Sequence, residues 1–198
     1  MSPFTLSAPG LRLDEFRSSD EAAIFQYCQD PVFERFLTIP WPYRRDDAEY
    51  FVREFVPQGW ADGSELTWAL RDPDGVFLGV IGLRLPTSDL GFWLGAERRG
   101  RGYMPRAVRL LTEWVFSSSV GGVTEVNWAC VEGNWSSMSV ARSCGFTYTG
   151  AGPASTAARD GSYPRSWHGV LRRGDPSVPQ PGWPAPPPGT PRWWETES

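Results

Sequence analysis

The sequence predicts an α/β fold in which a mixed, mostly antiparallel sheet is flanked by helices. Its 198 residues are enough for one well-buried core and few for two. Segments with the apolar period of a helix are interleaved with β-rich runs. Two of those runs are separated by a short turn that contains Asp74-Gly75, which is typical of an antiparallel hairpin. We therefore expect one domain over residues 1–175 and a tail over residues 176–198.

The N-terminal part of the chain reads as a strand followed by helices. Residues 11–16 alternate apolar and polar side chains like a strand, and residues 18–30 start with Ser and Asp capping candidates before a helical pattern. A second short helix is expected in residues 30–37. Pro40 and Pro42 then interrupt any helix before the helical period resumes in residues 46–56. This Pro/Trp-rich loop is a candidate rim for a substrate site.

The hairpin signals follow directly. Residues 65–72 and 76–85 are its two predicted strands, and residues 88–95 form a third strand. A glycine- and arginine-rich loop comes next, and a helix is expected after it up to Phe116. The apolar face of this helix has the spacing i, i+3, i+4, i+7 and i+8, formed by Ala107, Leu110, Leu111, Trp114 and Val115.

The C-terminal part adds three strands and a short helix. Strands are expected in residues 124–131, 146–150 and 166–173, and the helix lies between Asn134 and Gly145. Residues 176–198 contain eight prolines, which favour a polyproline-like tail over a packed element. Because a solvated tail seldom carries several tryptophans, we expect Trp183, Trp193 and Trp194 to dock on the domain or on a partner.

Composition limits the functions that the chain can have. The 19 basic and 23 acidic residues give a net charge of -4, which argues against a nucleic-acid scaffold held by phosphate contacts. The single histidine, His168, leaves few possible zinc sites and makes a Ser-His-Asp triad depend on that one residue. We expect no metal, no nucleic-acid partner and a monomer or homodimer.

The cysteines and the apolar runs indicate a compartment. Cys28, Cys130 and Cys144 have neither paired spacing nor an even count, and no secretory leader precedes them, so a disulfide framework is not expected. No apolar run approaches the roughly 20 residues that cross a bilayer. We expect a cytoplasmic protein without a membrane partner.

The loop before the long helix is typical of anion binding. Gly100 and Gly102 allow successive backbone N–H groups to point into one concavity, and the helix start adds the positive end of its dipole. A pyrophosphate fits such a site, although a glycine-rich turn is often only a tight connection. The Gly-Lys-Ser/Thr end of a Walker loop is absent, and so is the third glycine of a dinucleotide fingerprint.

The flanking residues make the pattern more specific. Residues 89–111 resemble the central motif of the GCN5-related N-acetyltransferases (GNAT), especially the branch that acetylates ribosomal-protein N-termini. The motif Arg/Gln-x-x-Gly-x-Gly/Ala corresponds to Arg99, Gly102 and Met104, so Met replaces the final small residue. Arg106 stands where that branch usually has an acidic residue.

A second signature of the same family follows in the expected order. Its pattern, Asn-x-x-Ser, a helix and then Gly-Phe, corresponds to Asn134, Ser137, Gly145 and Phe146. The resemblance covers roughly residues 8 to 174 and implies the GNAT fold, in which two central strands splay apart. It also implies transfer of an acetyl group from acetyl-CoA to a primary amine.

The resemblance assigns the binding of acetyl-CoA to named residues. The diphosphate is expected on the loop and helix start, and the pantetheine arm beside the third strand of the sheet, where a backbone N–H polarises the thioester carbonyl. Asn134 is expected to hold the pantetheine or the loop. The cofactor-binding candidates are Trp93, Leu94, Arg99, Gly100, Arg101, Gly102, Tyr103, Met104, Asn134 and Ser137.

The acceptor must lose a proton before it attacks, so the resemblance also implies a base. Asp89 is the leading candidate and Glu132 the second, while Ser137 is the candidate proton donor to the leaving thiolate. Asp89 also reads as a turn residue, and Asn134 and Ser137 also read as helix-capping residues. Thr149 stands where the ribosomal-type branch often has a glutamate, which leaves the base open.

Aromatic residues are the candidates for acceptor binding. The substrate-binding candidates are Trp41, Tyr43, Trp135 and His168, and Trp60 is expected in a loop that borders the same side. Packing explains His168 as well as binding does. The acceptor is a peptide N-terminus or a small amine such as an antibiotic or metabolite. The alternative function is a non-catalytic acyl-CoA-binding module or sensor with a Trp-rich interaction tail.

Overall fold

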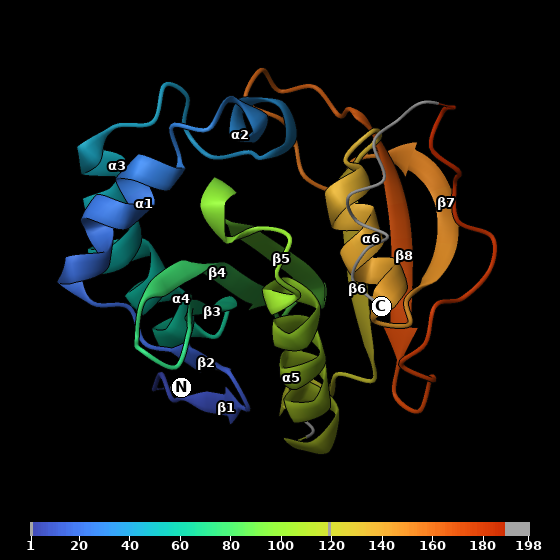
Figure 1. Ribbon diagram of the computed structural model, residues 1–198, viewed down its shortest axis with the longest axis horizontal. Helices are drawn as coiled ribbons and strands as arrows, with labels where there is room; N and C mark the ends of the chain where they lie inside the picture. Colours follow the sequence, from blue (N-terminus) through green and yellow to red (C-terminus); the bar gives the residue numbers. More distant parts are fainter. Residues whose placement is uncertain (1, 119, 189–198) are drawn as a thin grey trace. The chain divides into compact units, whose positions relative to one another are not determined.

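The computed structural model describes residues 2–118 and 120–188, and the chain divides into two compact units, Met1–Arg99 and Gly100–Ser198 (Figure 1). The first unit contains five antiparallel strands in sequence order. The strands are β1 Leu6–Ala8, β2 Leu11–Asp14, β3 Glu65–Arg71, β4 Phe77–Arg84 and β5 Asp89–Leu94. Strand β1 was not expected from the sequence, because three residues are too short for a period of two to stand out.

Helices occupy the first unit between β2 and β3. They are η1 Ser18–Asp20, α1 Glu21–Tyr27, α2 Pro31–Phe36, α3 Arg45–Tyr50, η2 Phe51–Phe55 and α4 Val56–Asp62, and η3 Ala96–Arg98 follows β5. Helices α1 and α3 pack side by side, and α4 packs against β3 (Figure 1). The core beneath them includes Ile24, Phe33 and Val80.

The helix predicted to end at residue 56 continues to Asp62. Pro57 lies in the first turn of α4, and a π-helical turn, η2, precedes it. Proline has no N–H to donate to the residue four positions earlier, and a wider turn absorbs that missing bond. The same turn places the rings of Phe51 and Phe55 in a stack, with centroids 5.7 Å apart.

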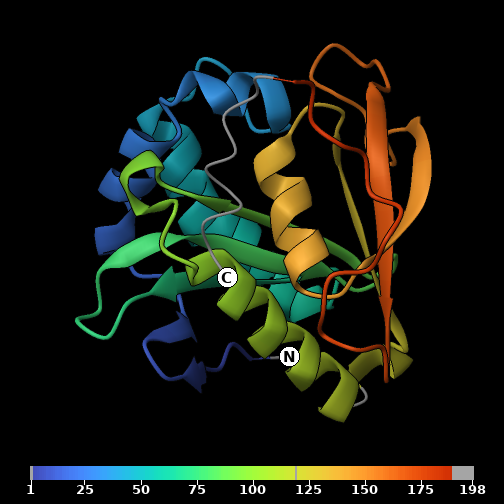
Figure 2. The same cartoon turned by 45° about the vertical axis from the view of Figure 1, so that its right-hand side comes forward.

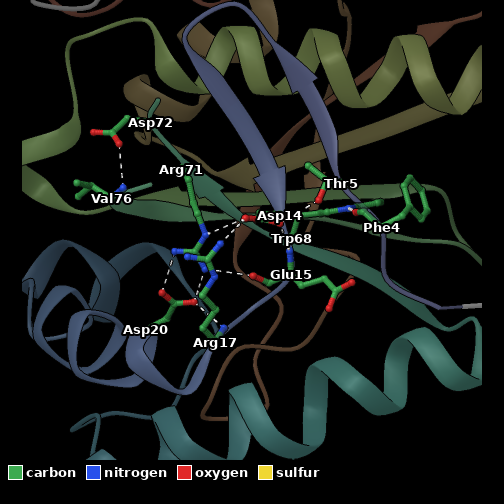
Figure 3. A network of polar contacts seen from close by, with 10 residues as sticks. All are labelled: Phe4, Thr5, Asp14, Glu15, Arg17, Asp20, Trp68, Arg71, Asp72 and Val76. Atoms are coloured by element: carbon green, nitrogen blue, oxygen red, sulfur yellow. Dashed lines mark hydrogen bonds and ion pairs between the residues drawn. The ribbon is translucent and has the colours of Figure 1, made fainter. Parts of the chain in front are cut away.

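A buried ion pair joins the start of α1 to β3 (Figure 3). The guanidinium of Arg71, 2% exposed, donates from Nη1 and Nη2 to the Asp20 carboxylate at 2.9 and 2.6 Å. Arg71 also approaches Asp14, which accepts from Thr5. Partial burial raises the pKa of Asp14, but the hydrogen bonds from Thr5 and Glu15 and the charges of Arg17 and Arg71 lower it further, so the net pKa is depressed.

The second unit contains an antiparallel sheet in the order β6–β8–β7. Its elements are α5 Tyr103–Ser118, η4 Val120–Gly122, β6 Glu125–Val131, α6 Trp135–Ser143, β7 Thr147–Pro153 and β8 Arg165–Arg172. Helix α6 packs against β6 and against α5 (Figure 2). The α/β class with antiparallel strands flanked by helices is confirmed, whereas the splay predicted between two central strands stays a prediction.

Part of the proline-rich tail packs on the second unit. Gly145 has a φ of 89°, and a Cβ there would collide with the carbonyl of Pro176. The ring of Trp183 contacts Trp128 and Tyr148, with centroids 5.6 and 5.4 Å apart. The expectation that Trp183 docks on the domain is confirmed, whereas Trp193 and Trp194 lie outside the described residues.

None of the helices within residues 2–118 and 120–188 has both the length and the apolar character that a membrane span needs. The same residues contain no group of three or more His, Cys, Asp and Glu side chains placed to hold a metal ion.

Candidate active site

The loop that leads into α5 has the backbone conformation that the sequence predicts. Gly100 and Gly102 have φ angles of 71° and 65°, and a Cβ built on either residue meets nothing within 4 Å. Conformation rather than crowding therefore requires glycine at both positions. The first amides of α5, at Tyr103 and Met104, have no acceptor within the helix. Open space and outward amides suit an anion.

The two departures from the family motif reinforce this helix start. Met104 is only 2% exposed, so its side chain is buried and leaves the outer side of the loop clear. Arg106 donates from Nε to the Gly102 carbonyl at 3.2 Å, and its guanidinium lies 5.2 Å from the centroid of the Tyr103 ring. Arg106 thus clamps the loop, while Arg101 is exposed and supplies its charge to the surface.

Arg99 is held within the first unit. It forms an ion pair with Asp30 at 2.8 Å, donates from Nε and Nη2 to the Leu94 carbonyl at 3.2 and 3.1 Å, and lies over the Phe33 ring. These contacts tie the end of β5 to α2. The expected role of Arg99 in cofactor binding stays a prediction.

The backbone amides of β5 point to two different edges of the strand. Gly95 donates to the Leu78 carbonyl on β4 at 3.0 Å, and Trp93 is in register with Val80. Because amides alternate between the two edges of a strand, those of Phe92 and Leu94 point away from β4. The geometry favours the amide of Leu94 over that of Trp93 as a donor to a bound carbonyl, and it adds Phe92, which the sequence analysis did not single out.

Ser137 is part of a polar cluster at the start of α6. Asn134 caps this helix, since its Oδ1 accepts from the Ser137 amide at 3.2 Å. The Ser137 Oγ accepts from the indole Nε1 of Trp128 at 3.1 Å, which leaves the hydroxyl proton for another acceptor. Cys130 is next to this hydroxyl. Burial raises the pKa of Cys130 to about 12, although the hydrogen bond from Ser137 acts to lower it.

Glu132 lies outside this cluster. Its carboxylate pairs with Nε of Arg165 at 2.9 Å, and the two side chains are 45% and 69% exposed. An exposed carboxylate paired with an arginine is typical of a surface ion pair. The structure does not bring Glu132 to Ser137 by any contact among the described residues.

Asp89 begins β5 in a row of charged residues. It is in register with Arg84 on β4, which is in register with Glu65 on β3. Nε of Arg84 lies 3.3 Å from Glu65 Oε2. Asp89 is half-buried and shares a face of the sheet with Gly91 and Trp93, because side chains two apart in a strand point the same way.

The face that carries this row is the floor of a cavity of about 440 Å³ within the first unit. Side chains of four segments line it, namely the loop before α3, helix α3, turn η2 and the strands β3 to β5. Those used in the argument below are Tyr43, Asp47, Phe51, Phe55, Glu65 and Thr67. Asp89 is not one of the lining residues, although its row neighbours Glu65 and Arg84 are.

The predicted acceptor-binding residues fall into different places. Tyr43 is 6% exposed and lines the cavity, whereas Trp41 is half-buried in the same loop and does not line it. Trp135 begins α6 and packs on Trp167, with ring centroids 4.5 Å apart. His168 is half-buried in β8, in register with Ala129 on β6 and Gly150 on β7.

The expectation that Trp60 lies in a loop is wrong. It is in α4, 1% exposed, and its Nε1 donates to the Thr67 carbonyl at 3.0 Å. Sequence reasoning missed Glu65 and Thr67 in the cavity. Their signal was present, since they are polar residues at alternate positions of a strand whose other members are mostly apolar.

Comparison with known proteins assigns the family. A family model described as the acetyltransferase (GNAT) domain matches residues 10–147. None of the curated proteins matches the chain. Many solved structures do, and those described below, at 17 or 18% identity, show a common fold.

Three of these structures illustrate the likeness. A Vibrio cholerae protein, provisionally described as a ribosomal-protein-serine acetyltransferase, has a TM-score of 0.76 at 17% identity, over 87% of this chain and 100% of that one. The microcin C7 self-immunity acetyltransferase MccE, in complex with acetyl-CoA and AMP, has a TM-score of 0.70 at 18% identity, over 84% and 94%. RimL, a ribosomal L7/L12 α-N-protein acetyltransferase in complex with CoA, has a TM-score of 0.70 at 17% identity, over 85% and 98%.

The resemblance inferred from the two sequence motifs is confirmed, because the family model spans more than half of the chain and includes the loop and the start of α6. Structures from the ribosomal-protein branch are among those with the same fold. The chain therefore belongs to the GNAT acetyltransferase family and is an acyltransferase.

Proposed function

We propose that the protein transfers the acetyl group of acetyl-CoA to a primary amine by direct attack. The observation that carries this proposal is the loop before α5, in which Gly100 and Gly102 have left-handed backbones that open onto empty space. MccE and RimL, which share the fold, bind acetyl-CoA and CoA, and this supports the choice of donor.

The residues present fit a CoA diphosphate. The amides at the start of α5 and the positive end of its dipole attract an anion, and the exposed Arg101 adds a charge. Met104, which replaces the small residue of the family motif, does not obstruct the anion, because its side chain is buried. We assign the diphosphate to residues Gly100 to Met104, with Arg106 holding the loop in place.

Acetyl-CoA supplies an acetyl group that is activated as a thioester. In our proposal, the outward amide of Leu94 donates to the thioester carbonyl oxygen, where negative charge develops as the amine adds. The C–N bond forms and the C–S bond breaks. Ser137 gives its hydroxyl proton to the departing sulfur and regains one when the amine nitrogen loses its proton, so that the products are an amide and a thiol.

An ammonium acceptor must first lose one proton to a base. Asp89 remains a candidate because it lies on the same face of β5 as Gly91, and Glu132 remains the weaker one because it is exposed and paired with Arg165. Glu65 joins them, because its carboxylate lines the cavity. The aromatic walls favour a small amine as acceptor, and a peptide N-terminus is the second candidate.

A thiol-release assay tests this function. Acetyl-CoA with a panel of primary amines should release thiol at a rate that depends on the amine, and the acetylated product should be found by mass spectrometry. Binding of acetyl-CoA without thiol release or product across the panel would instead support an acyl-CoA-binding module, as would release that is independent of the amine.

Two glycine substitutions separate binding of the donor from folding. Gly102→Ala should weaken acetyl-CoA binding by more than about tenfold, equivalent to about 1.4 kcal/mol, because a Cβ disfavours the left-handed backbone that aims the amides. Gly161→Ala is the matched control, since Gly161 has a φ of 79° and equally open surroundings in a turn of the second unit. Equal effects of the two substitutions would remove the loop from the binding site.

A further inference from the structure

The floor of the cavity in the first unit is a strip of sheet without side chains. Thr67 on β3 is in register with Gly82 on β4, and Gly82 is in register with Gly91 on β5. Gly91 is exposed and a Cβ there would meet nothing within 4 Å. Because two glycines are adjacent across the strands, a ligand can approach the backbone of β4 and β5 closely.

Two oxygen atoms converge above this strip. A Cβ built on Gly82 lies 3.1 Å from Thr67 Oγ1 and 3.4 Å from Glu65 Oε1. Thr67 is 4% exposed, and its Oγ1 is buried without a hydrogen-bond partner among the described residues. A buried hydroxyl in this state is unfavourable, so it indicates a group that arrives from outside the chain.

The chemistry of the two oxygens defines that group. A carboxylate accepts hydrogen bonds only, and Glu65 keeps its other oxygen near Arg84. A ligand must therefore donate a hydrogen to Glu65, whereas Thr67 can accept or donate, and a group with two or more hydrogens on one small atom can donate to both oxygens. A primary amine or ammonium does this, whereas an ether, a carbonyl or a carboxylate does not.

The walls of the cavity define the rest of the ligand. The rings of Phe51 and Phe55 stack on each other, and the edge of Trp93 meets Phe33 with centroids 5.5 Å apart. Tyr50 at the rim is 52% exposed. Flat apolar walls of this kind favour an aromatic or alkyl body. They offer few partners for the backbone N–H and C=O groups that follow a peptide N-terminus.

The charges around the cavity agree with a cationic ligand. The carboxylates of Asp47 and Glu65 line it, and Arg84 is the one cation among its described lining residues. Asp47 accepts from the Arg44 amide at 2.7 Å, which fixes its carboxylate at the start of α3. A protonated amine enters a site with an excess of one negative charge.

We propose that this cavity binds a small arylalkyl primary amine, with its nitrogen above Gly82, hydrogen-bonded to Thr67 Oγ1 and Glu65, and its ring against Phe51 and Phe55. The identification of this cavity as the acceptor site rests on the proposed function, but binding of the amine does not require turnover. The volume of about 440 Å³ lies within the roughly 300–1,000 Å³ of small-molecule sites.

Calorimetry without acetyl-CoA tests the binding directly. The full chain should bind 2-phenylethylamine at least about tenfold more tightly than 2-phenylethanol, because the alcohol brings one hydrogen and no charge. A short peptide with a free N-terminus should bind more weakly than the amine. Equal affinity for amine and alcohol, or tighter binding of the peptide, would overturn the assignment.

Two threonine variants make the test independent of folding. Thr67→Val should reduce the affinity for the amine at least about fivefold without lowering the midpoint of thermal unfolding, because the lost hydroxyl has no partner in the protein. Thr112→Val is the matched control. Its Oγ1 donates to the Val108 carbonyl at 3.0 Å in α5, so this variant should leave the affinity unchanged and lower the midpoint.

Glu65→Gln should weaken amine binding more than alcohol binding, because it removes the charge and keeps the shape.

The proposed function and the proposed amine site can fail independently of each other. Amine binding that depends on Thr67 and Glu65, without acetyl transfer, would reject the proposed function and keep this site. Acetylation of amines with a KM for the amine that is the same in wild type, Thr67→Val and Glu65→Gln would support the proposed function and reject the site.

Discussion

The indole Nε1 of Trp128 donates a hydrogen bond to Ser137 Oγ at 3.1 Å. The ring of Trp183 in turn packs against the ring of Trp128. One lone pair of Ser137 Oγ is thus occupied by Trp128 of β6, which is contacted in turn by Trp183 of the tail. The orientation of the proposed proton donor depends on an indole that takes no part in the chemistry.

Replacement of Trp128 should therefore affect turnover more than binding. Trp128→Phe removes the N–H donor and keeps most of the ring, so we expect kcat to fall by about tenfold, less than the loss of a general acid. Ser137→Ala should be at least as slow, and the double variant should be no slower than Ser137→Ala alone. Steady-state kinetics measures all three.

The control for Trp128→Phe is Trp68→Phe in the first unit. Trp68 Nε1 also donates a hydrogen bond, to the Phe4 carbonyl at 2.9 Å, so this variant loses a comparable bond away from Ser137. It should lower stability without changing kcat. Additive losses in Trp128→Phe and Ser137→Ala would show that the two residues act independently.

Truncation of Trp183 should destabilise the second unit. The half-buried ring contacts Trp128 and Tyr148, so Trp183→Ala should lower the free energy of unfolding by about 1–2 kcal/mol, less than a fully buried aromatic. Trp183→Phe should not lower it, because Trp183 Nε1 is buried without a partner among the described residues. Urea denaturation measures both, and a stability of Trp183→Ala equal to wild type would show that the tail adds nothing.

Stability should fall in acid through Asp14. Its folded-state pKa is below the ordinary value, so its contribution is complete above that value and is lost as the pH falls from about 5 toward the folded-state pKa. Asp14→Asn should be less stable than wild type at pH 7, and the difference should shrink at low pH. A difference that stays constant down to pH 3 would contradict the depressed pKa.

The three cysteines should resist alkylation in the folded protein. Burial raises the pKa of Cys28 and Cys130 to about 12 and that of Cys144 to about 11, so the reactive thiolate is scarce at pH 8. Iodoacetamide should modify them only after denaturation, as read by mass spectrometry. An acetylated cysteine, trapped with acetyl-CoA alone, would contradict direct attack and indicate a covalent route.

The sequence predicted the elements whose local signals are strong. The hairpin at Asp74-Gly75, the loop at Gly100 and Gly102 and the cap at Asn134 depend on turn and capping chemistry within a few residues, and all three are found. The helix after residue 56 was missed because the π-helical turn that tolerates Pro57 leaves no sequence pattern of its own.

The cavity in the first unit could not be predicted in the same way. Its floor depends on the register that places Thr67, Gly82 and Gly91 in one row, and no single segment of the sequence specifies the register between separate strands. Glu65 and Thr67 were visible as polar residues in an apolar strand, but only the partner glycines show what they face. The predicted roles of Asp89, Glu132 and His168 stay predictions.

The glycine pair Gly82 and Gly91 on the cavity floor also has a consequence for how the specificity of the enzyme can change. A methyl group at position 91 would rise freely into the cavity, whereas one at position 82 would press on Thr67 and Glu65. In the proposed acceptor site, selectivity can thus be adjusted one carbon at a time on β5, without changing the residues assigned to acetyl-CoA. Closely related enzymes of this kind can diverge in their acceptor substrates while they keep the same site for the acetyl donor.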